Sequence, residues 1–590
     1  MILARPLKIQ KMRADGLWGT RTIYDAFAAN VAQFPDQEAV VDPPNRERFT
    51  DGAPQRLTWR ALQNKVERLS ALLYQHGLRR DDVVVVQLPN TVEQVTTYLA
   101  CHRLGIVVSP LPAVYREHEI GHALQVTQAR GLITATRIGK HPHAAMMTAL
   151  RAQFPRVHAV LAWGAKVPDG AIGLDAAMAQ VIALDAVQAY AAGIDLCADD
   201  VVSICWTSGT EALPKGVPRS SNEWYWQAKG TTEAIGMFPG MRVLNPFPLV
   251  NMGGMSFAFV GWLLEGATLV QHHPFDLDVY LGQLRDERID FTQAAPTILN
   301  RMLQNEDLVA GIDFSRIKRI GSGAAPLSAW MIETFAKRHG VEIINFFGSN
   351  EGAALCGSAR DIPDPNERAV LFPRPGVPGR PPWTYRVNNV VQTRLVSPET
   401  GEDVTEIGVV GEMRIDGPTV FSGYYNAPEI NANAFDAQGY FKTGDLFEIT
   451  GAAGQYLRFR GRLKDLIVRG GMKISAEEIE ALVLGHPAVA DAAMVGYPDD
   501  EMGERMCACI VPRAESSVDL DSLVQYLRTE KRVAAFKLPE RLLLLESLPR
   551  NPVGKLLKNV LREKASSGVA KDDGKDVPMH HQPHVGRSKS

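Results

Sequence analysis

The chain has 590 residues, of which 45% are hydrophobic and 22% are charged, and its formal net charge is −3. This length exceeds what a single hydrophobic core normally serves, so at least two domains are expected. The nearly balanced charge argues against the strongly basic classes of protein, and neither nucleic acid nor an anionic membrane is expected as a partner.

The cysteines and the first residues bear on the compartment. Six cysteines are spread between positions 101 and 509, with neither a disulfide framework nor paired CxxC spacing. They predict reduced thiols in a cytoplasmic protein. Residues 1–16 mix arginine and lysine with scattered apolar residues, which is not the pattern of a secretory signal.

The first half of the chain alternates helical and strand-like patterns. Residues 24–34 and 62–76 have helical spacing, and residues 83–88 form a β-branched run typical of a strand buried on both faces of a parallel sheet. Further strand-like runs precede helical patterns at residues 106–108, 132–133, 159–161 and 341–344. This alternation predicts an α/β architecture.

A strand-like run at residues 201–205 leads into a hydroxyl-rich loop that ends in Pro-Lys-Gly. Hydroxyl groups, backbone N–H groups around a glycine and a lysine make a cradle for phosphate oxygens. The Gly-Lys-Ser/Thr triplet of the Walker loop does not occur in the chain, so a phosphate loop of another kind is predicted. Its binding residues are Thr207, Ser208, Gly209, Thr210 and Lys215.

Residues 249–264 are uncharged and apolar, and Gly253 and Gly254 interrupt them. A membrane-spanning helix needs about 20 apolar residues. This segment therefore predicts a buried helix, and no transmembrane span is expected.

The sequence changes in character beyond residue 400. Residues 409–415 look like a strand, residues 460–465 concentrate charge and glycine, and Ser475 with Glu478 has capping-box spacing. A compact α+β pattern continues to about residue 563, and a polar segment follows. These changes predict a large domain at 1–461, a hinge at 462–465, a small domain at 466–564 and a disordered tail at 565–590.

Six segments in fixed order resemble the motifs of the AMP-forming acyl- and aryl-CoA synthetases, a superfamily of adenylate-forming enzymes. They are residues 206–217, 321–327, 345–352, 440–446, 461–465 and 549–555. The resemblance covers about residues 24–563. Two places depart from the usual motifs: Glu211 and Ala212 replace threonine and glycine in the loop, and Asn350 stands where threonine is usual.

The resemblance implies an α/β fold with a large N-terminal domain of mixed and parallel sheets, helices and a distorted β-barrel, and a small mobile α+β C-terminal domain. It also implies ATP, Mg²⁺ and coenzyme A as cofactors. The implied nucleotide-binding residues are Thr207, Ser208, Gly209, Thr210, Lys215, Gly323, Ala324, Ala325, Phe347, Gly348, Asn350, Glu351, Asp445 and Arg462.

The resemblance also assigns roles within this set. Phe347 would flank the adenine, Asn350 would donate a hydrogen bond to the α-phosphate, and Asp445 would accept both ribose hydroxyls. Glu351 and Thr210 would hold Mg²⁺, which prefers hard oxygen ligands. The implied catalytic residues are Lys555, Glu351, Thr207 and Lys215.

Three further sites are implied. Lys464 would be the hinge residue about which the small domain turns. The residues facing the thiol of CoA would be Arg469, Gly470 and Gly471, the glycines permitting close approach of the backbone. The acid pocket would comprise Asn251, Gly253, Gly254, Phe257, Gly348 and Gly352.

The implied reaction joins a carboxylic acid to the α-phosphate of ATP and then transfers the acyl group to CoA. The small and adaptable pocket residues, with no lysine or arginine among them, favour a medium- or long-chain fatty, alicyclic or aryl acid. One alternative is a ligase that loads the phosphopantetheine of a carrier protein. Another is a noncatalytic adenylate-binding module, suggested by the departures at Glu211 and Ala212, at Asn350, and at Asn251, which stands where many members of the adenylate-forming superfamily have histidine or an aromatic residue. A monomer or a homodimer is expected.

Overall fold

The computed structural model describes residues 1–180, 184–207, 214–323, 327–377, 381–470, 472–531, 533–551 and 555–567. Contacts divide the chain into two units. The first comprises Met1–Lys464 and Arg550–Lys555, and the second comprises Asp465–Pro549 and the residues from Leu556 onward. The change of unit after Lys464 falls inside the segment predicted as a hinge, and movement about it stays a prediction.

The first sheet of the large unit carries the predicted phosphate loop. Its seven strands run in the order β7 (Ile172–Gly173), β6 (Ala159–Trp163), β5 (Gly131–Ala135), β3 (Val83–Gln87), β4 (Val107–Pro110), β8 (Val201–Trp206) and β9 (Gly216–Ser220). Only β9 is antiparallel to its neighbour. Strand β3 is buried along its whole length, as its run of valines predicts.

The second sheet has eight strands. Their order is β15 (Ala354–Gly357), β14 (Glu342–Gly348), β13 (Arg319–Gly323), β12 (Phe291–Gln293), β10 (Arg242–Asn245), β11 (Thr268–Gln271), β1 (Glu38–Val41) and β2 (Arg56–Thr58). The edge strands β15 and β2 are antiparallel and the inner pairs are parallel. The carboxyl ends of β13 and β14 bring two of the predicted nucleotide motifs side by side.

The third sheet of the large unit is antiparallel. Its five strands run in the order β16 (Leu371–Pro373), β20 (Tyr456–Arg462), β19 (Phe441–Thr450), β18 (Val410–Asp416) and β17 (Gln392–Val396), so β16 and β17 form its edges.

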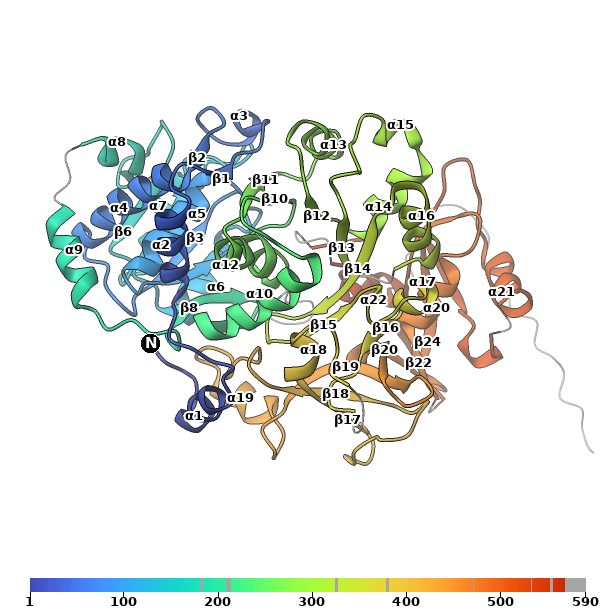
Figure 1. Cartoon of the computed structure of the whole chain (residues 1–590). Helices are drawn as coiled ribbons and strands as arrows, with labels where there is room; N and C mark the ends of the chain where they lie inside the picture. Colours follow the sequence, from blue (N-terminus) through green and yellow to red (C-terminus); the bar gives the residue numbers. More distant parts are fainter. Residues whose placement is uncertain are drawn as a thin grey trace, which may run out of the picture. The chain divides into compact units, whose positions relative to one another are not determined.

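Helices cover the two large sheets, with α5 against β4 and α7 against β5 and β6 (Figure 1). The helices of the large unit before β10 are α1 (Pro6–Ala14), α2 (Ile23–Gln33), α3 (Arg46–Phe49), α4 (Trp59–Gln75), α5 (Val92–Arg103), α6 (Glu117–Thr127), α7 (His143–Arg151), α8 (Leu174–Ala179), α9 (Leu184–Gly193) and α10 (Ser221–Ile235). Besides the segment at residues 252–265, the helices after β10 in this unit are α13 (Leu277–Asp286), α14 (Pro296–Gln304), α15 (Glu306–Val309), α16 (Ala329–His339), α17 (Pro365–Arg368), α18 (Val387–Val390) and α19 (Pro428–Ala434).

The apolar segment 249–264 is buried, as predicted, but it is not one regular helix. A short α11 (Met252–Gly254) passes into a π-helical turn, η1 (Met255–Gly261), and then into α12 (Trp262–Glu265). At Gly254 a Cβ atom would lie 2.2 Å from the carbonyl oxygen of Pro248, so glycine is required there. Among the described residues, no helix has the length and apolarity that crossing a membrane demands.

The second unit is a small α+β body. Its sheet has the order β22 (Met472–Ser475), β21 (Leu466–Arg469), β24 (Gly503–Pro512) and β23 (Val489–Asp499), with β25 (Arg541–Leu544) also paired to β24. Its helical elements are α20 (Ala476–Val483), α21 (Leu520–Thr529), η3 (Ala535–Lys537) and α22 (Lys558–Ser566), and the 3₁₀ turn η2 (Leu463–Asp465) precedes them. As the capping-box spacing predicts, the Ser475 side chain accepts a hydrogen bond from the Glu478 backbone N–H.

The last described helix corrects the predicted start of the tail. Helix α22 continues through Ala565 and Ser566, which the prediction assigned to the tail. Ala565 is fully buried in the core of the small unit, and this apolar contact extends the helix. Residues 568–590 lie outside the described residues.

The two units together form the predicted α/β architecture with a smaller α+β part. All six cysteines are free thiols: five of them are buried, and Cys197 is half-buried. Burial raises the pKa of the Cys101, Cys205 and Cys356 thiols, which keeps them protonated and inert.

Candidate active site

Two hydrogen bonds between Thr207 and Lys215 join the two ends of the predicted phosphate loop. Thr207, directly after β8, donates its N–H to the carbonyl of Lys215 at 3.0 Å. Lys215 in turn donates its N–H to the Thr207 hydroxyl, also at 3.0 Å. The antiparallel pairing of β8 with β9 therefore continues to the neck of the loop. Ser208, Gly209 and Thr210 lie outside the described residues.

Beside the end of the loop, Lys215 contacts Tyr424, and Tyr424 in turn contacts Glu351. The Lys215 ammonium lies 4.3 Å from the centre of the Tyr424 ring, a cation–π contact. The Tyr424 hydroxyl donates to Oε1 of Glu351 at 3.0 Å. Burial, reinforced by the Glu351 carboxylate, raises the pKa of Tyr424, so the phenol stays neutral and remains a donor. Sequence reasoning did not find Tyr424, because nothing in its local sequence marks it as a partner of residues 73 or more positions away.

The backbone around Glu351 is held by the segment that precedes Tyr424. Phe421 donates its N–H to the Glu351 carbonyl at 2.9 Å, and the Thr419 hydroxyl donates to the Gly352 carbonyl at 2.7 Å. Gly352 has φ +122°, and a Cβ atom there would lie 2.3 Å from the Thr419 carbonyl oxygen. Glycine is therefore required at this position, where two backbone segments meet.

Asn350 joins the loop to the α11 region. Its side-chain nitrogen donates to the Trp206 carbonyl at 3.0 Å, and its side-chain oxygen accepts the Met252 N–H at 2.7 Å. Its own carbonyl accepts from the fully buried Arg219 at 2.8 Å. These contacts tie three distant segments together, and the predicted hydrogen bond from Asn350 to an α-phosphate stays a prediction.

The motifs at the ends of β13 and β14 are closely packed. A Cβ atom on Gly323 would lie 2.1 Å from the Phe346 carbonyl oxygen, and one on Gly348 would lie 2.3 Å from Cε of Met252. The Phe347 ring meets the rings of Phe447 and Phe459 at centroid distances of 5.2 and 5.5 Å. Phe347 is half-buried, so it keeps exposed area. Ala324 and Ala325 lie outside the described residues.

Asp445 and Arg462 face each other across β19 and β20. Their register pairs them directly, and Nε of Arg462 lies 3.2 Å from Oδ1 of Asp445. Burial raises the pKa of the Asp445 carboxyl to about 6. Arg462 opposes this rise, Glu351 adds to it and Lys555 opposes it. Arg462, Glu351 and Lys555 therefore each lie within electrostatic range of the Asp445 carboxyl.

Lys555 belongs to the large unit by its contacts, although the chain reaches it after the small unit. Its N–H donates to Oδ1 of Asn551 at 2.8 Å. The opposing effect of its ammonium on the Asp445 pKa places it within electrostatic range of that carboxyl.

The residues predicted to line an acid pocket differ in their contacts and burial. Oδ1 of Asn251 accepts the Gly253 N–H at 3.1 Å and so caps α11. Gly254 is buried against the backbone of Pro248. Phe257 is fully buried in the core, with its ring 6.0 Å from that of Phe291. Their contact with an acid stays a prediction.

The predicted CoA-facing residues lie in the small unit. Arg469 donates to the Phe536 carbonyl at 2.8 Å and forms an ion pair with Glu540 at 2.6 Å. Gly470 has φ +55° and donates its N–H to the Met502 carbonyl at 2.7 Å. Gly471 lies outside the described residues, and the contact of these residues with a thiol stays a prediction.

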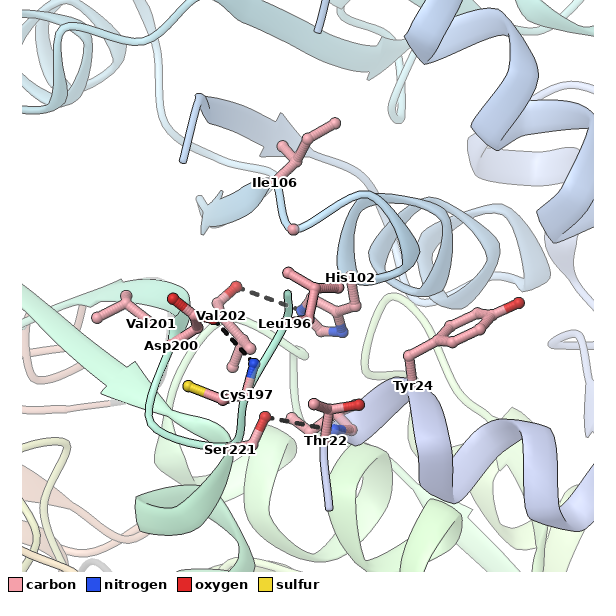
Figure 2. Close-up of a pocket in the computed structure, with 12 residues that line it drawn as sticks. Thr22, Tyr24, His102, Ile106, Leu196, Cys197, Asp200, Val201, Val202 and Ser221 are labelled. Atoms are coloured by element: carbon pink, nitrogen blue, oxygen red, sulfur yellow. Dashed lines mark hydrogen bonds between the residues drawn. The ribbon is translucent and has the colours of Figure 1, made fainter. Parts of the chain in front are cut away.

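A small internal cavity lies away from these residues, between the start of α2, the end of α5 and the start of β8 (Figure 2). Its volume is about 20 Å³, enough for a single water molecule and far below the several hundred Å³ of a ligand pocket. His102 lines it, with Nε2 3.3 Å from the Val202 carbonyl and Nδ1 lacking a protein partner. Its size and lining fit one water molecule and do not fit a ligand.

Two family models match most of the chain. The AMP-binding enzyme family matches residues 27–425, and the AMP-binding enzyme C-terminal domain matches residues 478–555. The pyochelin synthase PchD of Pseudomonas aeruginosa (strain UCBPP-PA14) is 32% identical over 93% of this chain and 93% of that protein. The 2-hydroxy-7-methoxy-5-methyl-1-naphthoate–CoA ligase of Streptomyces carzinostaticus is 31% identical over 94% of each chain.

A solved structure shares the architecture. The crystal structure of ATP-bound MatB from Rhodopseudomonas palustris superimposes with a TM-score of 0.75 at 25% identity, covering 92% of this chain and 98% of that one. The matches to the family and to these relatives extend over most of the chain. The chain therefore belongs to the AMP-binding enzyme family of adenylate-forming enzymes.

Proposed function

We propose that this protein is an ATP-dependent carboxylic acid–CoA ligase. It joins the acid to the α-phosphate of ATP, releasing pyrophosphate, and then transfers the acyl group from the acyl-adenylate to the thiol of CoA, releasing AMP. The observation that carries the proposal is the buried Asp445 carboxylate, which pairs with Arg462 at 3.2 Å and lies within electrostatic range of Glu351 and Lys555. Each of these residues comes from a different motif of the family.

The chemistry explains why such a site needs two kinds of charge. A carboxylate attacking a phosphate brings two anions together, so positive charge must stabilise the transition state. Lys555 and Lys215 supply ammonium groups. Glu351 is a hard oxygen ligand that fits Mg²⁺, with the Thr210 hydroxyl as the proposed second ligand. Bound there, Mg²⁺ neutralises charge on the phosphates.

The other nucleotide contacts follow from the same arrangement. The Asp445 carboxylate is proposed to accept the ribose hydroxyls, and the exposed part of Phe347 to stack on the adenine. Gly323 and Gly348 lack side chains where the nucleotide would approach the backbone. In the second half-reaction, Arg469 and Gly470 are proposed to lie beside the pantetheine arm after rotation about Lys464.

The proposed acid is a medium- or long-chain fatty, alicyclic or aryl acid. The similarity to a naphthoate–CoA ligase supports the aryl class. The proposed acid pocket contains no lysine or arginine to pair with a second carboxylate. The cytoplasm is the proposed compartment, in keeping with six free cysteines.

Exchange of labelled pyrophosphate into ATP tests the first half-reaction. We expect exchange with at least one member of a panel of fatty, alicyclic and aryl acids, and the acid that gives it identifies the substrate class. Thioester formation with free CoA as the only acceptor is then expected. Exchange without CoA transfer would assign the acceptor to a carrier protein, and no exchange with any acid would leave a noncatalytic adenylate-binding module.

The buried Asp445 predicts a pH dependence of ATP binding. Its pKa is raised to about 6, so the carboxylate that accepts the ribose hydroxyls is lost as the pH falls through that value. The KM for ATP is expected to be about tenfold higher at pH 5 than at pH 8, because each pH unit below the pKa removes about 90% of the remaining ionised form. Asp445→Asn should raise KM at pH 8 and remove this dependence. An unchanged KM across the range would contradict the role.

A further inference from the structure

Residues 1–18, here called the N-terminal arm, precede the residues that match the family. The arm contains α1 and is fixed at its start. The Met1 amino group donates to Oδ1 of Asp200 at 2.8 Å, and the Met1 carbonyl accepts the Val201 N–H at 2.8 Å. Arg13 forms an ion pair with the buried Asp199. The arm is thereby held against the start of β8, the strand that leads into the phosphate loop.

The arm also reaches a second, distant segment. Trp18 donates its indole N–H to the Pro418 carbonyl at 3.1 Å, and this hydrogen bond is buried. The Lys8 ammonium donates to the Val420 carbonyl. The arm therefore binds two alternate carbonyl groups of residues 418–421.

Thr419 and Phe421, the residues that follow Pro418 and Val420, bond to the backbone that carries Glu351. Thr419 bonds to the Gly352 carbonyl at 2.7 Å, and Phe421 bonds to the Glu351 carbonyl at 2.9 Å. The chain then continues to Tyr424, which bonds to the Glu351 carboxylate. Residues 418–421 are thus held on one side by the arm and on the other by the backbone that carries Glu351.

We propose that Lys8 and Trp18 are positioning residues for Glu351, acting through residues 418–421. The inference rests on the proposed function, because it assumes that Glu351 serves adenylation. Neither residue approaches the reacting atoms: each bonds to a carbonyl group whose neighbour holds the backbone of residues 351 and 352. Their loss would let Glu351 and Tyr424 drift from the geometry that the phosphates require.

The Lys8 ammonium holds the Val420 carbonyl although burying a charge is unfavourable. Burial lowers the pKa of its ammonium, while Glu223 and Asp416 favour the charged form. The ring of Trp18 lies 5.5 Å from the ammonium and adds a cation–π contact. Removing the ammonium leaves the Val420 carbonyl without this donor, and buried acceptors without partners destabilise their surroundings.

The test compares Lys8→Met with Lys11→Met in the full-length protein. Lys11 lies on the same helix with an exposed side chain, so its replacement controls for loss of charge from the arm. Hydrogen exchange of the peptide spanning residues 417–424 is measured by mass spectrometry, together with pyrophosphate exchange. In Lys8→Met we expect faster hydrogen exchange in this peptide alone and a kcat for pyrophosphate exchange about tenfold lower. Lys11→Met should match the wild type in both.

Trp18→Phe provides a second variant that keeps an aromatic ring and removes only the N–H donor. It should loosen the same peptide. Unchanged hydrogen exchange in both variants would overturn the proposal whether or not the protein turns over any acid. Faster hydrogen exchange with an unchanged kcat would also overturn the proposal, since the arm would then support the fold without positioning Glu351. If the wild-type protein gives no pyrophosphate exchange, the proposed function fails, and hydrogen exchange still decides whether the arm holds residues 418–421.

Discussion

Replacing Lys555 with alanine is expected to lower the rate of ATP–pyrophosphate exchange by at least about 100-fold. In the proposed reaction its ammonium stabilises charge that develops when the carboxylate attacks the α-phosphate. The second half-reaction does not use this charge. Thioester formation from preformed acyl-adenylate should therefore remain close to the wild-type rate. The measurement pairs single-turnover acyl transfer with pyrophosphate exchange, using the same acid in both.

Lys564→Ala is the matched control, because Lys564 is an exposed lysine near the end of α22. It should leave both half-reactions unchanged. Equal loss of both half-reactions in Lys555→Ala would show that the lysine supports the fold or both steps, and its assignment to adenylation would be wrong.

Replacing Lys464 with proline is expected to spare adenylation and to slow acyl transfer, the reverse of the Lys555 variant. Lys464 lies in the middle of the 3₁₀ turn η2, at the change from the large to the small unit. Proline fixes its own φ and restricts the preceding residue, so it limits rotation at this point. Adenylation should persist, while acyl transfer to CoA should fall by on the order of 100-fold, because the acceptor thiol is misplaced.

Lys464→Ala separates the backbone effect from loss of the side chain. Alanine leaves φ free, so acyl transfer should be much closer to the wild-type rate than in the proline variant. If the proline variant transfers the acyl group to CoA at the wild-type rate, Lys464 is not the hinge. If alanine is as damaging as proline, the side chain and not rotation is responsible.

Sequence patterns predicted the elements whose residue types are set by local burial or by a local cap. The run of valines in β3 and the strand before the phosphate loop were both recognisable, because burial on two faces selects β-branched residues locally. The capping pair of Ser475 and Glu478 is equally local. The π-helical turn η1 was not predictable in this way, since it packs against α10 and such a contact leaves no signal in the local sequence.

The site shows the same division. Glu351 and Asp445 lie in motifs that are recognisable in the sequence, although their roles remain predictions. Tyr424 was missed, because its partner Glu351 is 73 positions away. Lys8 was missed for the same reason, with Val420 412 positions away. No periodicity or spacing in a single sequence reports contacts of this kind, which arise only when the sheets and the arm are assembled.

The burial of the cysteines has a consequence for any enzyme that makes thioesters. An activated acyl group reacts with whichever thiolate reaches it first, and the protein carries six sulfur nucleophiles of its own. Five of them are shielded inside the core, and the sixth, Cys197, is half-buried and has its pKa raised, chiefly by burial. We therefore expect little self-acylation, so that the adenylate reacts with the thiol of the incoming acceptor.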